Sequence, residues 1–134
     1  MEKEIRAEMG ELEGALRWVR ECCAEAGLAR KESGDVELAM EEIITNIIRH
    51  AYAGKKGEIS LVCNLTKEEV QFIVKDSGVF FNPVQKHPKV DPTVDLDERK
   101  EGGLGIFFVE KLMDRVNYER QEPFNILRVS KKIP

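Results

Sequence analysis

The sequence has few of the residues that would cross-link the chain or anchor it in a membrane. It holds three cysteines in 134 residues, Cys22, Cys23 and Cys63, in no zinc-binding spacing. An odd number of thiols is typical of a reducing compartment, and we expect all three to be small core side chains. No stretch approaches the roughly 18 apolar residues of a membrane helix, and no apolar signal-peptide core opens the chain. These absences predict a cytoplasmic protein that does not contact a membrane.

An excess of positive charge is also missing. Lysine and arginine number 21 against 25 aspartate and glutamate, a net charge of −4, which argues against a direct nucleic-acid partner. The chain is 42% hydrophobic and 34% charged, as in ordinary globular proteins. A chain of this length can bury one core without disulfides or metals. We therefore expect a single domain over residues 1–134.

The strongest helical pattern runs from Glu37 to Tyr52. Apolar residues recur there at steps of three and four, so one half of the helix should be buried. A cap at Ser33 or Asp35 and an end at Ala53–Gly54 are expected. The apolar positions are Val36, Ala39, Met40, Ile43, Ile44, Ile47, Ile48 and Ala51.

The remaining elements follow from two patterns, the three- and four-residue steps of helices and the two-residue alternation of strands. Trp18 lies off the apolar stripe of its helix, where it would cover the core margin or meet a partner, and we favour the first. The order of elements predicts an α+β fold, a two-layer sandwich with a mostly antiparallel sheet and helices on one face. The expected elements are a short edge strand at Lys3–Ala7, a helix at Glu11–Ala26, a hairpin over Ile59–Val74, a helix at Ile106–Met113, and strands at Arg115–Arg120 and Asn125–Lys132.

The other half of the Glu37–Tyr52 helix carries polar residues. Glu42 and Asn46 are four residues apart and stack on one edge, which Arg49 and His50 continue. A proton acceptor beside an amide oxygen is what a magnesium–nucleotide site needs. Taken alone, such an edge is more often simply solvated.

Two glycine motifs lie further along the chain. Gly102–Gly105 precedes a helix, whose free backbone N–H groups can bind phosphate, although glycines there are as often hinges. The run is neither a P-loop nor a dinucleotide fingerprint. Asp76 ends a strand, and Gly78 follows two residues later. The carboxylate could accept a hydrogen bond from the exocyclic amine of adenine, while the glycine lets a base approach the backbone. By itself this motif is more often a turn.

Together the three motifs resemble a known family. Glu42-x-x-x-Asn46, Asp76-x-Gly78 and Gly102–Gly105 resemble the N, G1 and G2 boxes of the histidine-kinase-like ATPase superfamily, which includes gyrase, heat-shock chaperone, histidine kinase and mismatch-repair proteins. EEIITNIIRHAY and GGLGIFFVEKLMD resemble the anti-sigma-factor serine/threonine kinases, and the resemblance runs from about Lys3 to Lys132. It implies a histidine-kinase-like ATPase fold, ATP, Mg²⁺, a sigma-factor partner and an antagonist protein phosphorylated on serine or threonine.

The resemblance also implies roles for individual residues. Asn46 would be the magnesium ligand and also contact the nucleotide, and Glu42 would be the catalytic base for the substrate hydroxyl. Asp76 would hold the adenine amine, and Gly78 would shape its pocket. Backbone groups for the phosphates would come from Gly102, Gly103, Leu104 and Gly105.

The irregular stretch 79–101, broken by prolines, would be an ATP lid. Arg99 could reach the terminal phosphate from it, or be a solvated charge. Arg49 and His50 are near enough to assist, but we favour His50 as a packed helix residue. The resemblance leaves open whether the protein forms a homodimer.

The sequence departs from the family at two positions. Phe80 stands where many members have a second glycine, so the lid entrance should be stiffer. The threonine common near the start of the last strand is absent, and Asn125 is the candidate substitute.

These features leave competing functions. The leading hypothesis is an ATP-dependent protein kinase that also binds a sigma factor in a partner-switching pathway, and the alternative is a non-catalytic ATP-responsive binding module. Glu42 favours the enzyme, because a pure binding site needs no base, whereas Phe80 leans the other way. The catalytic half of a histidine kinase is disfavoured because no dimerisation helices precede the domain.

Overall fold

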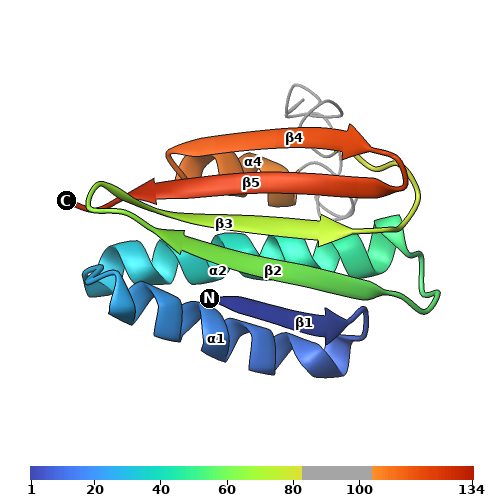
Figure 1. Ribbon diagram of the computed structural model, residues 1–134, viewed down its shortest axis with the longest axis horizontal. Helices are drawn as coiled ribbons and strands as arrows, with labels where there is room; N and C mark the ends of the chain where they lie inside the picture. Colours follow the sequence, from blue (N-terminus) through green and yellow to red (C-terminus); the bar gives the residue numbers. More distant parts are fainter. Residues whose placement is uncertain (83–103) are drawn as a thin grey trace.

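The chain forms an antiparallel five-stranded sheet with its helices on one side (Figure 1). The computed structural model describes residues 1–82 and 104–134, with side chains from Phe108 onward in the second range. The strands lie in the order β1-β2-β3-β5-β4, and all neighbouring pairs are antiparallel. The predicted two-layer α+β sandwich is confirmed. The strands are β1 (Glu2–Arg6), β2 (Glu58–Leu65), β3 (Glu69–Asp76), β4 (Arg115–Gln121) and β5 (Phe124–Lys132).

Within the described ranges, three α-helices pack on this sheet. They are α1 (Leu12–Glu25), α2 (Arg30–Asn46) and α4 (Leu104–Leu112). A 3-10 turn, η1 (Met9–Glu11), precedes α1, and a π-helical turn, η2 (Ile47–Ala51), continues α2. Because α2 packs against both α1 and α4, it is the central helix of its layer.

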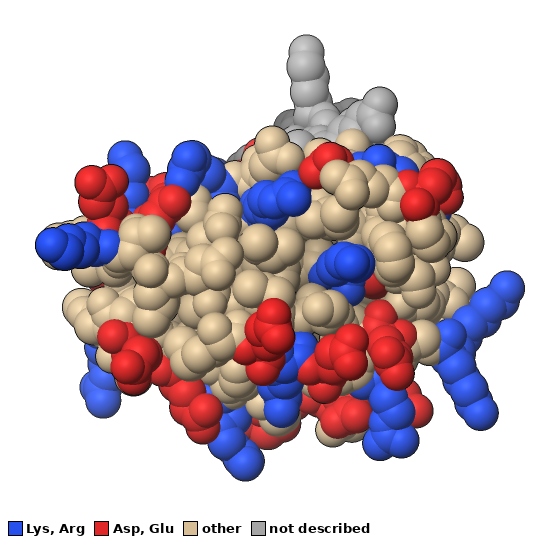
Figure 2. All heavy atoms as spheres, in the orientation of Figure 1, with Lys and Arg blue, Asp and Glu red and all other residues tan. Residues whose placement is uncertain are grey.

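The opposite face of the sheet is left uncovered by helices in the described part of the chain. Figure 2 views this face, where uncharged side chains occupy most of the centre and charged ones gather mainly along the edges. Among the described residues, no helix combines the length and apolar character needed to cross a membrane.

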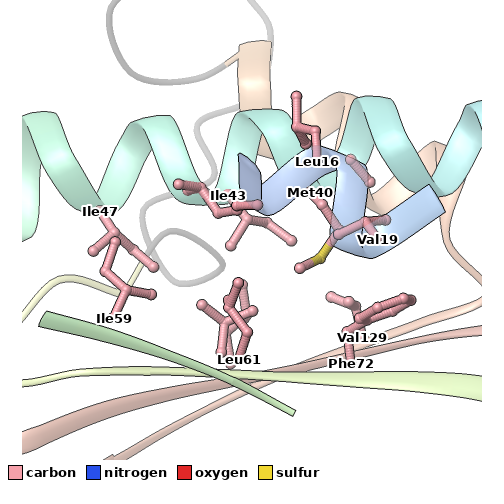
Figure 3. Packing of buried hydrophobic residues seen from close by; sticks show 14 of the residues in the cluster. Leu16, Val19, Met40, Ile43, Ile47, Ile59, Leu61, Phe72 and Val129 are labelled. Carbon is pink, nitrogen blue, oxygen red and sulfur yellow. The ribbon is translucent and has the colours of Figure 1, made fainter. Parts of the chain in front are cut away.

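The core lies between α1, α2 and the inner face of the sheet (Figure 3). Side chains of α1 and α2 point toward those of the strands, and burying each large apolar side chain is worth about 1.5–3 kcal/mol. Trp18 packs edge-on against Phe72, with ring centroids 5.9 Å apart, so the predicted place at the core margin is confirmed. The predicted burial of all three cysteines as free thiols is also confirmed.

The predicted start of the central helix is wrong. α2 begins at Arg30, before both Ser33 and Asp35, and Ala29 at its N-cap makes no side-chain capping hydrogen bond. Asp35 lies inside the helix and forms an ion pair with Lys131 of β5 at 3.3 Å. A long-range partner therefore uses the carboxylate that the local pattern assigns to capping.

The predicted end of that helix is confirmed. After Ala51 the backbone turns left-handed at Ala53 (φ 51°) and Gly54 (φ 81°). The last turn before it is π-helical, a conformation that is rare and often found at functional sites. This turn carries Arg49 and His50.

Candidate functional site

The polar edge of α2 lies between two hollows in the surface. Ile43, Asn46 and Ile47 line a pocket on the side toward β3 and β5. Glu42, Asn46 and Arg49 line a groove on the side toward η1. Asn46 is therefore shared by the pocket and the groove, and its half-buried side chain makes no hydrogen bond to any residue in the described ranges.

The pocket toward the sheet is small, with a cavity volume of about 20 Å³. Apolar side chains form most of the wall, and a few polar groups converge on it, as is usual for a ligand that combines a flat ring with hydrogen-bonding atoms. Its lining residues are Ile43, Asn46, Ile47, Asp76, Phe81, Tyr118, Asn125 and Leu127.

Asp76 is the carboxylate of this pocket. Alternation along β3 places it on the inner face with Phe72 and Val74, and only 3% of it is exposed. Its Oδ1 accepts the Gly78 N–H at 2.9 Å and the Asn125 amide at 2.9 Å. Burial raises the pKa of Asp76, and these hydrogen bonds oppose the rise. A carboxylate that is buried in a largely apolar pocket costs stability, and such groups are often found at binding sites.

Gly78 lies where no side chain could fit. A Cβ added to it would lie 2.5 Å from the carbonyl oxygen of Ala51 in η2. The next residue, Val79, donates its N–H to that same oxygen at 2.9 Å. Arg120 holds the other side of the turn by donating to the Gly78 carbonyl at 3.0 Å. The Asp76–Gly78 turn is therefore packed directly on the π-helical end of the central helix.

Several residues around this turn were not singled out from the sequence. Tyr52 accepts the Ser77 N–H at 2.9 Å and donates to the Glu58 carbonyl at 2.5 Å. Tyr118 donates to Asn125 Oδ1 at 2.5 Å. Ser77 lies 25 positions from Tyr52, and the contact of Tyr118 with Asn125 depends on the pairing of β4 with β5, so motif spacing gives no sign of them. The alternation of β4 could have placed Tyr118 on the inner face, but it names no partner.

The groove on the other side of α2 is larger and more open, with a volume of about 710 Å³. One wall is formed by Met9 and Leu12, and the other by the outer edge of α2 and η2. Glu42 makes no hydrogen bond or ion pair within the described ranges, so its carboxylate is available to a ligand. The full lining is Met9, Leu12, Glu41, Glu42, Thr45, Asn46, Arg49 and His50.

His50 joins the groove to the pocket. Its ring stacks on Phe81, which lines the pocket, with centroids 5.3 Å apart and planes inclined by 20°. His50 is half-buried in this contact, as a packed helix residue would be.

Only some of the candidate phosphate-binding residues lie within the described ranges. Arg99, Gly102 and Gly103 lie outside the described residues, as does most of the stretch 79–101, so their roles stay predictions. Leu104 and Gly105 form the first turn of α4, and α4 packs against α2. The N-terminus of α4 thus belongs to the same helical layer as Glu42 and Asn46.

The described residues offer no protein cage for a magnesium ion. No group of three or more acidic, histidine or cysteine side chains that could hold a metal exists among the described residues. Mg²⁺ in nucleotide sites is commonly held by one or two protein oxygens together with phosphates and water, rather than by a protein cage. The unpaired amide of Asn46 fits that arrangement.

The chain matches a known family model and is similar to several known proteins. The model of the histidine kinase-like ATPase domain matches residues 5–131. Serine-protein kinase RsbW of Bacillus mycoides (strain KBAB4) is 33% identical over 104 residues, which cover 75% of this chain and 65% of that protein. RsbW of Bacillus cereus (strain AH187) is 32% identical over the same coverage. The matched region thus spans less than two-thirds of the length of these relatives, 65%.

Solved structures share the fold. The RsbU and RsbW domains of Rv1364c from Mycobacterium tuberculosis superpose with a TM-score of 0.70 and 17% identity, covering 99% of this chain and 31% of that one. The SiaB–SiaC complex from Pseudomonas aeruginosa gives 0.58 and 13%, covering 99% and 89%. From the match over residues 5–131, this chain belongs to the histidine kinase-like ATPase domain family.

Proposed function

We propose that this chain is an ATP-dependent protein serine/threonine kinase of the anti-sigma-factor type. It would phosphorylate an antagonist protein and bind a sigma factor in a partner-switching pathway. The similarity to the serine-protein kinase RsbW supports the reaction class. One observation carries the proposal: Asn46 borders both hollows, with Asp76 in the pocket on one side and Glu42 in the groove on the other.

Each hollow suits one substrate. The adenine of ATP would enter between the side chains that line the pocket, where Asp76 can accept a hydrogen bond from its exocyclic amine, and the phosphates would then pass Asn46 toward the groove. A bound Mg²⁺ would neutralise charge on the phosphates and would be held by the amide oxygen of Asn46. The backbone of the glycine run 102–105 would donate to the phosphates.

Glu42 acts on the acceptor. When the serine or threonine oxygen of the antagonist bonds to the terminal phosphorus, the bond from that phosphorus to its bridging oxygen breaks and ADP leaves. The hydroxyl proton passes to the Glu42 carboxylate, which faces the groove. This requires the acceptor segment to enter through the groove, because the base would occupy the pocket side of α2.

The walls of the groove suit an extended protein segment. Met9 is 48% exposed and offers an apolar contact opposite the polar edge of α2. Exposed Arg49, further along that edge, places a positive charge where a phosphoryl group would develop negative charge.

The test is phosphoryl transfer from radiolabelled ATP to a candidate antagonist protein, with Mg²⁺ present. We expect label on a serine or threonine of that protein and sigma-factor binding that depends on the nucleotide. Nucleotide binding without transfer to any antagonist would instead identify an ATP-responsive binding module. Absence of nucleotide binding would contradict both functions.

A further inference from the structure

Asn125 lies at the inner face of β5, and all the donors and acceptors of its side chain are hydrogen-bonded to other residues of the protein. Its Nδ2 donates to Asp76 Oδ1 at 2.9 Å and to the Val79 carbonyl at 2.9 Å. Its Oδ1 accepts from the Tyr118 hydroxyl at 2.5 Å and from the Phe81 N–H at 3.3 Å. A primary amide has two N–H donors and two acceptor lone pairs, so none is left for a ligand. Although Asn125 lines the pocket, it holds other groups rather than the base.

The partners determine which way this amide points. The Val79 carbonyl and an ionised Asp76 can only accept hydrogen bonds, whereas the Phe81 N–H can only donate one. A reversed amide would set its oxygen against two acceptors and its NH₂ against a donor. The Tyr118 hydroxyl, which can rotate, completes the favoured arrangement by donating.

This arrangement decides what Asp76 offers to a ligand. Oδ1 already receives two N–H groups, from Gly78 and Asn125. Oδ2 has no hydrogen-bond partner in the described ranges, and Asp76 lines the pocket. A base therefore meets an acceptor oxygen, which a 6-amino group satisfies and a 6-oxo group opposes.

The same amide also holds one wall of the pocket. By binding the Val79 carbonyl and the Phe81 N–H, it fixes the chain that follows Gly78. Phe81 then lines the pocket and stacks on His50. Removing the amide would release the carboxylate and this aromatic wall together.

We propose that Asn125, held by Tyr118, is a positioning residue that sets the preference of the site for a 6-aminopurine over a 6-oxopurine nucleotide. The inference rests on the proposed function, which places the base beside Asp76. It adds that selectivity depends on a residue with no free group to touch the base.

The experiment compares the dissociation constants of ATP and inosine triphosphate, both with Mg²⁺, for the full chain and its variants. Inosine triphosphate differs from ATP in the purine 6-position, and its phosphates are the same. Asn125→Leu removes the amide, Asn125→Thr keeps one donor, and Tyr118→Phe removes only the group that donates to the amide oxygen. Asn117→Leu, an exposed asparagine of β4, is the matched control.

We expect the wild type and Asn117→Leu to favour ATP by about 100-fold or more, since a site that hydrogen-bonds a substrate group rejects analogues lacking it. Asn125→Leu should lower that ratio by about 10-fold or more, because the loosened aromatic wall weakens both nucleotides alike, whereas the released carboxylate weakens ATP alone. Asn125→Thr should recover part of the ratio, and Tyr118→Phe should lower it by about threefold.

An equal loss for both nucleotides in Asn125→Leu, or an unchanged ratio, would overturn the inference and leave Asn125 a structural residue. If that variant does not fold, an unchanged ratio in Tyr118→Phe overturns it instead. Failure of the proposed function looks different, because the wild type would then bind neither nucleotide.

Discussion

Asp76 combines a cost in stability with a use in binding. A carboxylate that is 3% exposed loses most of its hydration, which raises its pKa. Two hydrogen bonds to Oδ1 recover part of that loss. Groups held in this way are often conserved by function rather than by folding, so their neutral replacement can stabilise a protein while removing its activity.

Asp76→Asn should separate these two effects. Because the folded-state pKa of Asp76 is raised, the ionised carboxylate destabilises the fold at neutral pH. This destabilisation disappears as the pH falls toward about 4, the pKa of an aspartate in the unfolded chain. The nucleotide-free variant should therefore gain stability over the wild type at pH 7 and lose this advantage near pH 4. Urea unfolding at several pH values measures it. A variant whose advantage grows toward acid pH would contradict the assigned shift.

The same variant should bind ATP at least about 10-fold more weakly, because an amide nitrogen would replace an acceptor oxygen at the pocket. Calorimetric titration at pH 7 gives this value. Unchanged affinity would remove Asp76 from the base site.

The residues within the motifs could be predicted from the sequence, whereas the long-range hydrogen bonds that hold them in place could not. Glu42 and Asn46 lie on one edge because of helical spacing, and Gly78 is needed for close backbone approach, so local rules identify them. Arg120 reaches the Gly78 carbonyl across 42 positions, and Asn125 reaches Asp76 across 49. Such contacts depend on the strand order β3-β5-β4, which no local pattern specifies.

At the scale of elements, the π-helical turn η2 supports the Asp76–Gly78 turn beside the pocket. The carbonyl of Ala51 receives the Val79 N–H, and the backbone at Gly78 lies against it. The sequence predicts where this helix ends but not the extra residue in its last turn. It also misses the start of α2, because the ion pair of Asp35 with Lys131 is a long-range contact.

Gly78→Ala should destabilise the protein because its Cβ would lie 2.5 Å from a backbone oxygen. We expect a loss of about 1–3 kcal/mol in the free energy of unfolding, together with weaker ATP binding. Gly34→Ala is the matched control, since Gly34 lies inside α2 with nothing within 4 Å of an added Cβ. It should instead gain about 0.5–1 kcal/mol. Denaturant unfolding of both proteins measures the two effects, and equal changes would contradict the close packing.

The groove between η1 and α2 can be tested separately from the pocket. Met9→Glu replaces an exposed apolar contact and should raise the KM for the antagonist by about 5–30-fold, while the dissociation constant of ATP stays within about twofold. Leu65→Glu places the same charge on an exposed apolar residue of β2, away from the groove. Steady-state kinetics with both variants would exclude the groove if their KM values were equal.

At the scale of the whole molecule, the proposed site joins both layers. Asp76 and Asn125 come from the sheet, and Asn46 comes from α2, so a bound nucleotide would connect strands and helices. Mg-ATP at 100 times its dissociation constant should add about 2.7 kcal/mol and raise the melting temperature by roughly 5–15 °C. Asn46→Ala should reduce the part of this shift that requires Mg²⁺. A melting temperature indifferent to nucleotide would contradict the site.

The most direct measurement is the rate of phosphoryl transfer to the antagonist by wild type and Glu42→Gln, with ATP affinity determined on the same samples. Glutamine keeps the shape of the side chain but cannot take the hydroxyl proton. Transfer should fall by about 10²–10⁴-fold, while ATP affinity and sigma-factor binding change little. Transfer by Glu42→Gln at the wild-type rate would contradict the role of Glu42 as the base.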